Sequence, residues 1–216
     1  MIGSNSSQYA ASYMHVIFEE NLSKKMPVEE SLKQTFKQMH NEIEKKKFKD
    51  GTAAIMVYLK SDTLWLANAG ESLAIVSQRN RPFPIYRDRR CDLSDEKRRI
   101  KSAGGFIDEE GLINGISPLS RSLGDCQQHP HVYWLPDILQ IDVNNLFEYI
   151  IIASDGVWDF VSFEQAVNIV NTEVDPFVSS IKIKDFAYQL GSDDNISVIV
   201  IRFHHKVLNS FDITKK

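Results

Sequence analysis

The N-terminal part of the chain carries apolar residues at helical spacing. In residues 4–25 the apolar side chains recur three or four positions apart, with polar residues between them. This pattern predicts an amphipathic helix. Pro27 interrupts it, and the same spacing returns over residues 28–48 and ends in the charged turn Lys45-Lys46-Lys47. The sequence therefore predicts two consecutive helices that pack antiparallel.

After Gly51 the apolar pattern becomes that of β-strands, interrupted by turn-forming residues. The predicted strands are residues 53–59, 63–69 and 72–77. We interpret these strands as an antiparallel meander. The first of them is almost continuously apolar, which is typical of a strand covered on both faces. We expect helices on one face and a second sheet on the other.

The rest of the chain alternates between helical and strand patterns. Ser94 is expected to start a short helix over residues 94–102, with acidic residues in its first turn and Gly104-Gly105 at its end. A long connection containing three prolines follows. The later predictions are a strand over 147–153, helices over 163–173 and 176–190, and a strand over 196–203. Strands in two blocks with helix pairs between them predict an α+β fold of packed sheets flanked by helices.

Length and charge limit the class of protein. With 216 residues and 43% hydrophobic content the chain can bury a full core. We expect one domain over residues 1–205 and a flexible tail over 206–216, where apolar residues are few. The formal charge of -4 argues against a general nucleic-acid binder. The arginine-rich segment 87–90 and the basic residues 97–99 are interpreted as a solvated loop and helix face, with a phosphopeptide-docking patch as the alternative.

The cysteines and the apolar runs indicate the compartment. Cys91 and Cys126 form no CxxC pair, so neither a zinc site nor a disulfide framework is predicted. No apolar run has the length of a membrane span, and the N-terminus lacks the pattern of a signal peptide. We expect an intracellular protein, cytoplasmic or nuclear, that binds neither membranes nor nucleic acid.

Two acidic positions next to apolar strands are the candidate chemistry. Asp155 and Gly156 directly follow the strand ending at Ala153, so the carboxylate lies at the rigid end of a buried element and the glycine allows a close backbone approach. Asp194 precedes the last strand, where its carboxylate could converge with that of Asp155. Mg²⁺ and Mn²⁺ prefer such oxygen ligands. Alternatively, Asp155 only caps a turn. Asp193 is a second choice for Asp194, and we interpret it as a loop residue.

Four segments form one ordered series along the chain: residues 68–72, residues 114–125, Ala153-Ser154-Asp155-Gly156-Val157-Trp158-Asp159, and residues 191–198. Together they resemble one enzyme family, the metal-dependent protein serine/threonine phosphatases of the PP2C (PPM) type. The resemblance extends from the first helix to about Phe203. It implies a PP2C-like β-sandwich flanked by antiparallel helix pairs, a Mg²⁺ or Mn²⁺ cofactor, and a metal shared by Asp155 and Asp194.

The resemblance also gives expected roles for single residues in these segments and shows where the chain departs from the family pattern. Glu71 stands where the family commonly has a metal-binding aspartate, and it is interpreted as either a metal ligand or a solvated turn residue. Arg121 is expected in a buried structural ion pair, with phosphate binding as the alternative. Asp125 is a turn aspartate or an outer-sphere ligand, and Asn114-Gly115 is expected to make a tight turn. Arg89 replaces a histidine of the family pattern.

The chain opens with Met1-Ile2-Gly3, which predicts that the family's first strands and the bridging aspartate of its Asp-Gly-His loop are absent. Asp155 and Asp194 would then bind one ion weakly. We therefore favour an inactive or weakly active pseudophosphatase, a regulatory module that binds a phosphoprotein or a regulatory protein. The alternative is an active Mg²⁺- or Mn²⁺-dependent phosphatase whose missing ligands come from upstream sequence or a partner. An exposed sheet would also favour a homo-oligomer.

Overall fold

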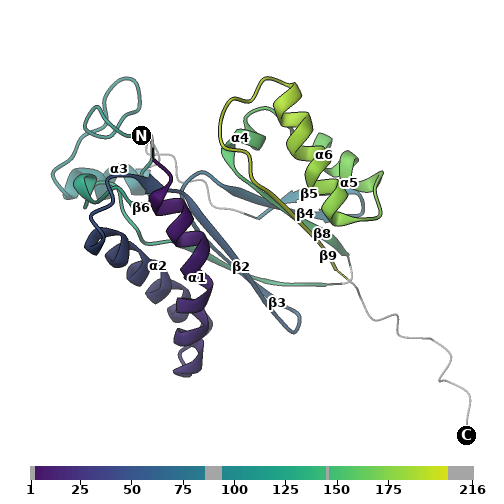
Figure 1. Cartoon of the computed structure of the whole chain (residues 1–216), viewed down its shortest axis with the longest axis horizontal. Coiled ribbons are helices and arrows are strands. Elements are labelled where there is room, and N and C mark those ends of the chain that lie inside the picture. Colours follow the sequence, from purple (N-terminus) through teal and green to yellow (C-terminus); the bar gives the residue numbers. More distant parts are fainter. Residues whose placement is uncertain (1–2, 86–93, 145, 204–216) are drawn as a thin grey trace, which may run out of the picture. The chain divides into compact units, whose positions relative to one another are not determined.

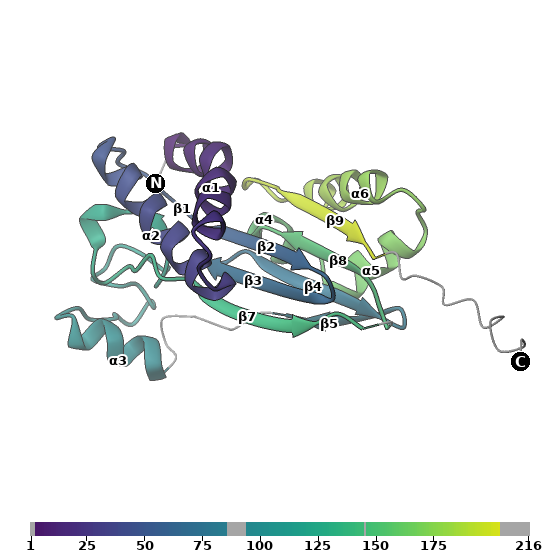
Figure 2. The same ribbon diagram turned by 90° about the horizontal axis from the view of Figure 1, so that it is seen from below.

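The computed structural model describes residues 3–85, 94–144 and 146–203 (Figure 1). Its contacts divide the chain into two compact units. The first unit consists of Met1–Leu73 and Ile85–Asp142, and the second of Ala74–Pro84 and Val143–Lys216. Figure 2 shows the same ribbon from a direction perpendicular to that of Figure 1.

Two long helices, α1 (Asn5–Ser23) and α2 (Val28–Lys45), begin the first unit and pack against each other. Their apolar stripes form one core cluster with three alanines of the adjoining sheet, Ala54, Ala67 and Ala69. Because alanine side chains are small, the helices can approach the sheet closely. Both predicted helices are confirmed. Lys25 and Lys47, just beyond the two helices, have positive φ of 60° and 57°, a left-handed conformation that stops each helix.

The N-terminus of α1 is capped from a distant part of the chain. The carboxylate of Asp50, which is 4% exposed, accepts hydrogen bonds from the backbone N–H of Asn5 at 2.7 Å and of Ser6 at 3.3 Å. The hydroxyl of Ser6 donates to the same carboxylate at 2.9 Å. The side chain of Ser4, at the N-cap position, makes no capping bond. The negative charge of this carboxylate also interacts favourably with the positive end of the helix dipole.

The sheet of the first unit contains β2 (Ala54–Lys60), β3 (Thr63–Ala69) and β7 (Asp137–Asp142), in the order β2-β3-β7. All neighbours are antiparallel. Two short strands, β1 (Gly51–Thr52) and β6 (Leu123–Gly124), form a separate pair. The helix α3 (Ser94–Ser102) and the 3-10 turn η1 (Cys126–Gln128) lie in the same unit. The predicted helix over residues 94–102 is confirmed.

The second unit has a sheet with the order β5-β4-β8-β9. Its strands are β4 (Leu73–Gln78), β5 (Arg81–Pro84), β8 (Phe147–Ala153) and β9 (Val198–Arg202). Its helices are α4 (Asp155–Trp158), α5 (Phe163–Asn171) and α6 (Pro176–Gln189). Buried residues of β8 pack against α5 and α6 in one core cluster. Ser162 forms a capping box at the start of α5, and Asp175 caps α6.

The prediction that residues 72–77 continue a meander is wrong. The strand exists as β4, but it pairs with β5 in the second sheet, and β7 takes the place beside β3. The turn after β3 explains the difference. Gly70 has φ of 123°, and a Cβ at this position would lie 2.4 Å from the Cβ of Ala53. Asn68 holds the turn by donating its side-chain amide to the carbonyls of Gly70 and Ser72. The chain thus leaves the sheet instead of forming a hairpin.

Candidate functional site

Asp155 lies where the buried strand β8 passes into α4. The strand is buried from Tyr149 to Ala153, and α4 begins at Asp155 itself. The Oδ1 atom of Asp155 accepts the backbone N–H of Gly156 at 2.9 Å. Because Ser154 is the N-cap residue of α4, this bond satisfies a backbone N–H within the first turn of the helix and is not an N-cap bond. It occupies one carboxylate oxygen, so the side chain keeps capacity for a further ligand.

The segment that carries Asp194 packs directly on the first turn of α4. A Cβ on Gly156 would lie 2.6 Å from the carbonyl oxygen of Asn195 and 3.3 Å from the Cβ of Asp194. A side chain at position 156 would therefore push the two segments apart. The close approach that the glycine allows is thus to the chain itself at residues 194–195. The structure thus places the segment of Asp194 beside the first turn of α4, which begins at Asp155, and a metal ion shared by the two carboxylates stays a prediction.

The electrostatics of this pair favour a bound cation. Burial raises the pKa of Asp155, and the charges of Asp194 and Asp159 raise it further. Within the described residues no Lys, Arg or His forms an ion pair with Asp155 or Asp194. Two carboxylates that repel each other, with oxygen donors only, fit a hard divalent ion. Asp193, next to Asp194, is exposed.

The pair does not by itself make a complete metal centre. Among residues 3–85, 94–144 and 146–203 no group of three or more His, Cys, Asp or Glu side chains could hold a metal ion. Divalent ions such as Mg²⁺ commonly keep several waters and take only one or two carboxylates from the protein. The described residues therefore offer two oxygen ligands of the kind that such an ion takes, and binding of a metal at this pair stays a prediction.

Glu71 belongs to the first unit, whereas Asp155 and Asp194 belong to the second. Its side chain is exposed in the turn that Gly70 and Asn68 build after β3. The side-chain oxygen of Asn68 is buried and has no hydrogen-bond partner. The proposed metal-binding role of Glu71 stays a prediction.

Arg121 lies in a buried ion network, as predicted. Its guanidinium donates to Oε1 of Glu96 at 2.6 and 3.2 Å and to the carbonyl of Leu135 at 2.7 Å, and it lies 3.5 Å from a carboxylate oxygen of Asp137. Arg99 donates to the other oxygen of Glu96 at 2.9 and 3.0 Å. Burial alone would raise the pKa of Glu96, but the two arginines hold it below its usual value. The network fastens α3 to the segments around residues 121 and 135.

Two smaller predictions concern turns. Asn114 and Gly115 have φ of 53° and 70°, which confirms a tight turn of the type with two positive φ angles. Asp125 also has a positive φ, 47°, and starts η1. Its carboxylate accepts the hydroxyl of Ser122 at 2.7 Å and lies over Gly51, where an added Cβ would come within 1.9 Å of it. These contacts favour the turn interpretation of Asp125.

Some predictions fall outside the described residues. They concern the basic segment 86–90 with Arg89, Cys91 and the tail over 206–216. Cys126, which is described, is a free thiol. None of the described helices is long and apolar enough to cross a membrane.

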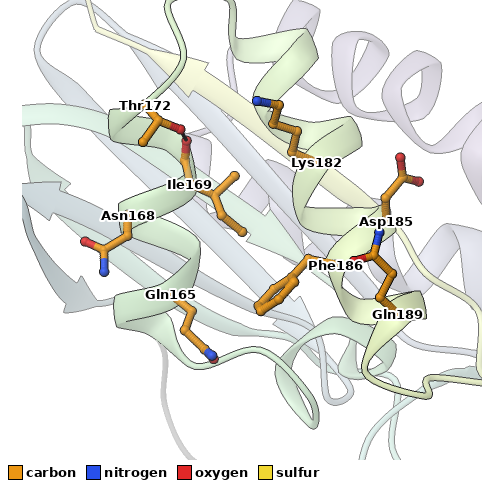
Figure 3. Close-up of a pocket in the computed structure, with 8 residues that line it drawn as sticks. All are labelled: Gln165, Asn168, Ile169, Thr172, Lys182, Asp185, Phe186 and Gln189. Carbon is orange, nitrogen blue, oxygen red and sulfur yellow. Dashed lines mark hydrogen bonds between the residues drawn. The ribbon is translucent and has the colours of Figure 1, made fainter.

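A cavity of about 520 Å³ lies between α5 and α6 and was not predicted from the sequence (Figure 3). Ile169 and Phe186 form its apolar part. Its polar lining residues are Gln165, Asn168, Thr172, Lys182, Asp185 and Gln189. Neither Asp155 nor Asp194 lines this cavity, so it is separate from the candidate cation site. Its walls come from two helices, and no local sequence signal marks a space that forms only when the helices pack.

Comparison with known proteins places this geometry in a family. The family description "Protein phosphatase 2C" matches residues 1–196. The chain is 32% identical over 206 residues to "Probable protein phosphatase 2C 52" of Oryza sativa subsp. japonica, covering 91% of the chain and 42% of that protein. It is 39% identical over 155 residues to "Probable protein phosphatase 2C 11" of Arabidopsis thaliana, covering 71% of the chain and 42% of that protein.

Solved structures show a similar fold. A sex determining protein of C. elegans superposes with a TM-score of 0.81 at 24% identity, covering 92% of this chain and 53% of that one. A phosphatase from Toxoplasma gondii superposes with a TM-score of 0.75 at 18% identity, covering 94% and 82%. At these identities the likeness concerns the fold. The chain spans about half the length of the curated relatives that it matches.

Proposed function

Because the chain belongs to the protein phosphatase 2C family, we propose that it is a protein serine/threonine phosphatase domain that retains part of a divalent metal site. In this proposal the 216-residue chain by itself is inactive or weakly active and serves as a regulatory binding module. The observation that carries the proposal is the meeting of Asp155 and Asp194 at the end of β8, without a cationic side chain among the described residues to neutralise them.

The residues of the junction have separate roles in this proposal. Asp155 and Asp194 hold one Mg²⁺ or Mn²⁺ ion, and Gly156 permits their close approach. A bound divalent ion lowers the pKa of a coordinated water and neutralises charge on a phosphate. Hydrolysis by a two-metal site needs carboxylates shared between two ions, because two cations a few ångströms apart repel each other strongly. Two carboxylates fit one ion better than two, which supports weak activity.

The alternative is an active Mg²⁺- or Mn²⁺-dependent phosphatase whose further ligands come from additional sequence or a partner. The intact packing around Gly156 is the observation in its favour. Glu71 would be one such further ligand. The two candidates differ in the number of metal ions bound and in turnover, so one pair of measurements separates them.

The test combines metal titration with phosphate release. Mn²⁺ binding to the chain is followed by calorimetry, and hydrolysis of p-nitrophenyl phosphate and a phosphoserine peptide is followed at millimolar Mn²⁺. We expect one weak site, lost in Asp155→Ala and retained in Asp185→Ala, an exposed aspartate paired with Lys184 in the same unit. Two tight sites with turnover that Asp155→Ala abolishes would overturn the weakly active function in favour of the alternative.

For partners we propose a phosphoprotein or a regulatory protein, and self-association through the second sheet. β9 is the last strand in that sheet, and its residues Ile199 and Ile201 are 55% and 42% exposed. The outer side of an apolar edge strand is a template for pairing with another chain. Light scattering at micromolar concentration tests self-association, and a monodisperse monomer would contradict it.

A further inference from the structure

Two serine hydroxyls hold the junction between Asp155 and Asp194. Ser154 directly precedes Asp155, and its hydroxyl donates to the carbonyl of Asn195 at 2.8 Å. The same hydroxyl accepts the backbone N–H of Ser197 at 3.1 Å, and the backbone N–H of Ser154 donates to the carbonyl of Ser197 at 3.1 Å. One residue thus makes three hydrogen bonds to the segment that follows Asp194.

Ser192 acts from the other side of Asp194. Its side chain is almost fully buried, at 4% exposure, and its hydroxyl donates to the carbonyl of Gly156 at 2.7 Å. Its backbone N–H donates to the carbonyl of Ala187 in α6 at 3.1 Å. Ser192 therefore ties the first turn of α4 to the end of α6. Asp194 lies between the two points at which these serines attach.

The residues between those points have little other support. Asp193, Asp194 and Asn195 are all exposed, and the Oδ1 atom of Asp194 accepts a local hydrogen bond from the backbone N–H of Asn195 at 2.6 Å. The two carboxylates repel each other when no cation lies between them. A segment that is exposed and repelled would move away unless other bonds held it. The serine hydroxyls supply those bonds.

We propose that Ser154 and Ser192 are positioning residues for the cation site, in which their hydroxyls fix the spacing between the carboxylates of Asp155 and Asp194. This inference rests on the proposed function. The serines do not touch the ion. They act through the aspartates, in the manner of outer-shell groups whose loss typically weakens metal binding 10- to 100-fold.

A buried serine elsewhere in the same unit provides a matched control. Ser179 is fully buried in α6, and its hydroxyl donates to the carbonyl of Asp175 at 3.0 Å. Ser179→Ala removes a buried hydroxyl and one hydrogen bond, as Ser192→Ala does, but at a position that bonds to neither segment of the cation site. If the serines of the junction were ordinary structural hydroxyls, the three alanine variants would behave alike.

The experiment measures Mn²⁺ affinity of the full chain by electron paramagnetic resonance of free Mn²⁺. The variants are Ser154→Ala, Ser154→Thr, Ser192→Ala, Ser179→Ala and Asp155→Asn, each checked by thermal unfolding in excess chelator. We expect Ser154→Ala and Ser192→Ala to weaken binding about 10-fold, and Ser154→Thr to restore it because the hydroxyl is kept. Ser179→Ala should bind as the parent does.

The outcomes separate this inference from the function on which it rests. Loss of binding in Asp155→Asn together with parental affinity in Ser154→Ala would overturn the serine proposal and leave the proposed function standing. Equal affinity in the parent and Asp155→Asn would overturn both. Should Ser192→Ala fail to fold, the partly exposed Ser154 and its threonine variant decide the question, and failure of threonine to restore binding would count against the hydroxyl.

Discussion

Glu96 and Asp155 are both acidic residues at the start of helices, yet their neighbouring charges and the directions of their pKa shifts are opposite. Glu96 in α3 is 1% exposed and receives hydrogen bonds from Arg99 and Arg121. Its pKa is lowered in spite of its burial. Burial raises the pKa of Asp155 at the start of α4, and the charges of Asp194 and Asp159 raise it further. The first acid is neutralised within the described protein, and the second is not.

The difference between the surroundings of Glu96 and Asp155 distinguishes an acid with a structural role from one that is available to a ligand. A buried carboxylate with two arginines is complete, because its charge and its lone pairs are satisfied. A carboxylate pair without a cationic partner has an electrostatic cost in the folded state that a divalent ion would remove. Perturbed pKa values alone do not make this distinction, since ion networks and ligand sites both produce them. The direction of the shift and the identity of the neighbours do.

The largest expected effect comes from breaking the satisfied network. Glu96→Gln would leave Arg99 and Arg121 without their shared carboxylate and should lower the free energy of unfolding by about 3 kcal/mol. Urea denaturation followed by circular dichroism measures this change. As a control, Glu29→Gln removes one partner of the exposed pair with Lys33 and should change stability by less than about 0.5 kcal/mol. If Glu96→Gln lowered the free energy of unfolding by less than about 1 kcal/mol, the claim that Glu96 has a structural role would be contradicted.

A smaller effect of opposite sign is expected at the second acid. Asp155→Asn removes the repulsion with Asp194 and retains an oxygen for the backbone N–H of Gly156. The metal-free variant should be more stable than the parent, by up to about 1 kcal/mol, since ligand sites are commonly built at some cost in stability. Thermal unfolding in excess chelator tests this. Added Mn²⁺ should stabilise the parent and leave the variant unchanged, and a destabilised variant would argue against repulsion in the parent.

The smallest expected effect is a difference in pH dependence. The pKa of Glu96 is below its usual 4.5 in the folded state, so its contribution to stability is present above pH 4.5 and is lost as the pH falls. The pKa of Asp155 is above its usual 3.8, so its contribution is present below pH 3.8 and is lost as the pH rises through the raised value.

Metal-free unfolding between about pH 3 and pH 6 should therefore change in opposite ways in the two variants. Glu96→Gln should remove part of the decline in stability on the acid side. Asp155→Asn should remove part of the decline as the pH rises. Parallel curves for the parent and Asp155→Asn would show that the folded state does not shift the titration of this carboxylate.

Much of the fold could be predicted because the decisive signals are local. Apolar spacing identified α1 and α2, and the apolar run at 147–153 matches β8 residue for residue. The partners of strands are not local. β4 was predicted as a strand but placed in the wrong sheet, because the turn at Gly70 depends on contact with Ala53. The strand β7 was missed within the long connection, and only its pairing with β3 makes it visible.

The candidate site was predictable to the same extent. Asp155 and Asp194 could be selected as candidates because both adjoin apolar strands, but their binding of a metal stays a prediction. Arg121 could be assigned to an ion pair, although its partner Glu96 could not be named. The roles of Ser154 and Ser192 could not be predicted, since serine is common in loops and its hydroxyl bonds depend on segments about forty residues away. Predictions on a single domain, on Glu71 and on partners stay predictions.

The capping of α1 by Asp50 has a consequence for synthesis of the chain. A nascent chain leaves the ribosome from its N-terminus, so α1 emerges before the residue that completes its first turn. Until residue 50 follows, the backbone donors of Asn5 and Ser6 have only water as a partner. The apolar faces of α1 and α2 are also incomplete until the alanines of β2 and β3 arrive. During translation this helix therefore depends on sequence that is made after it.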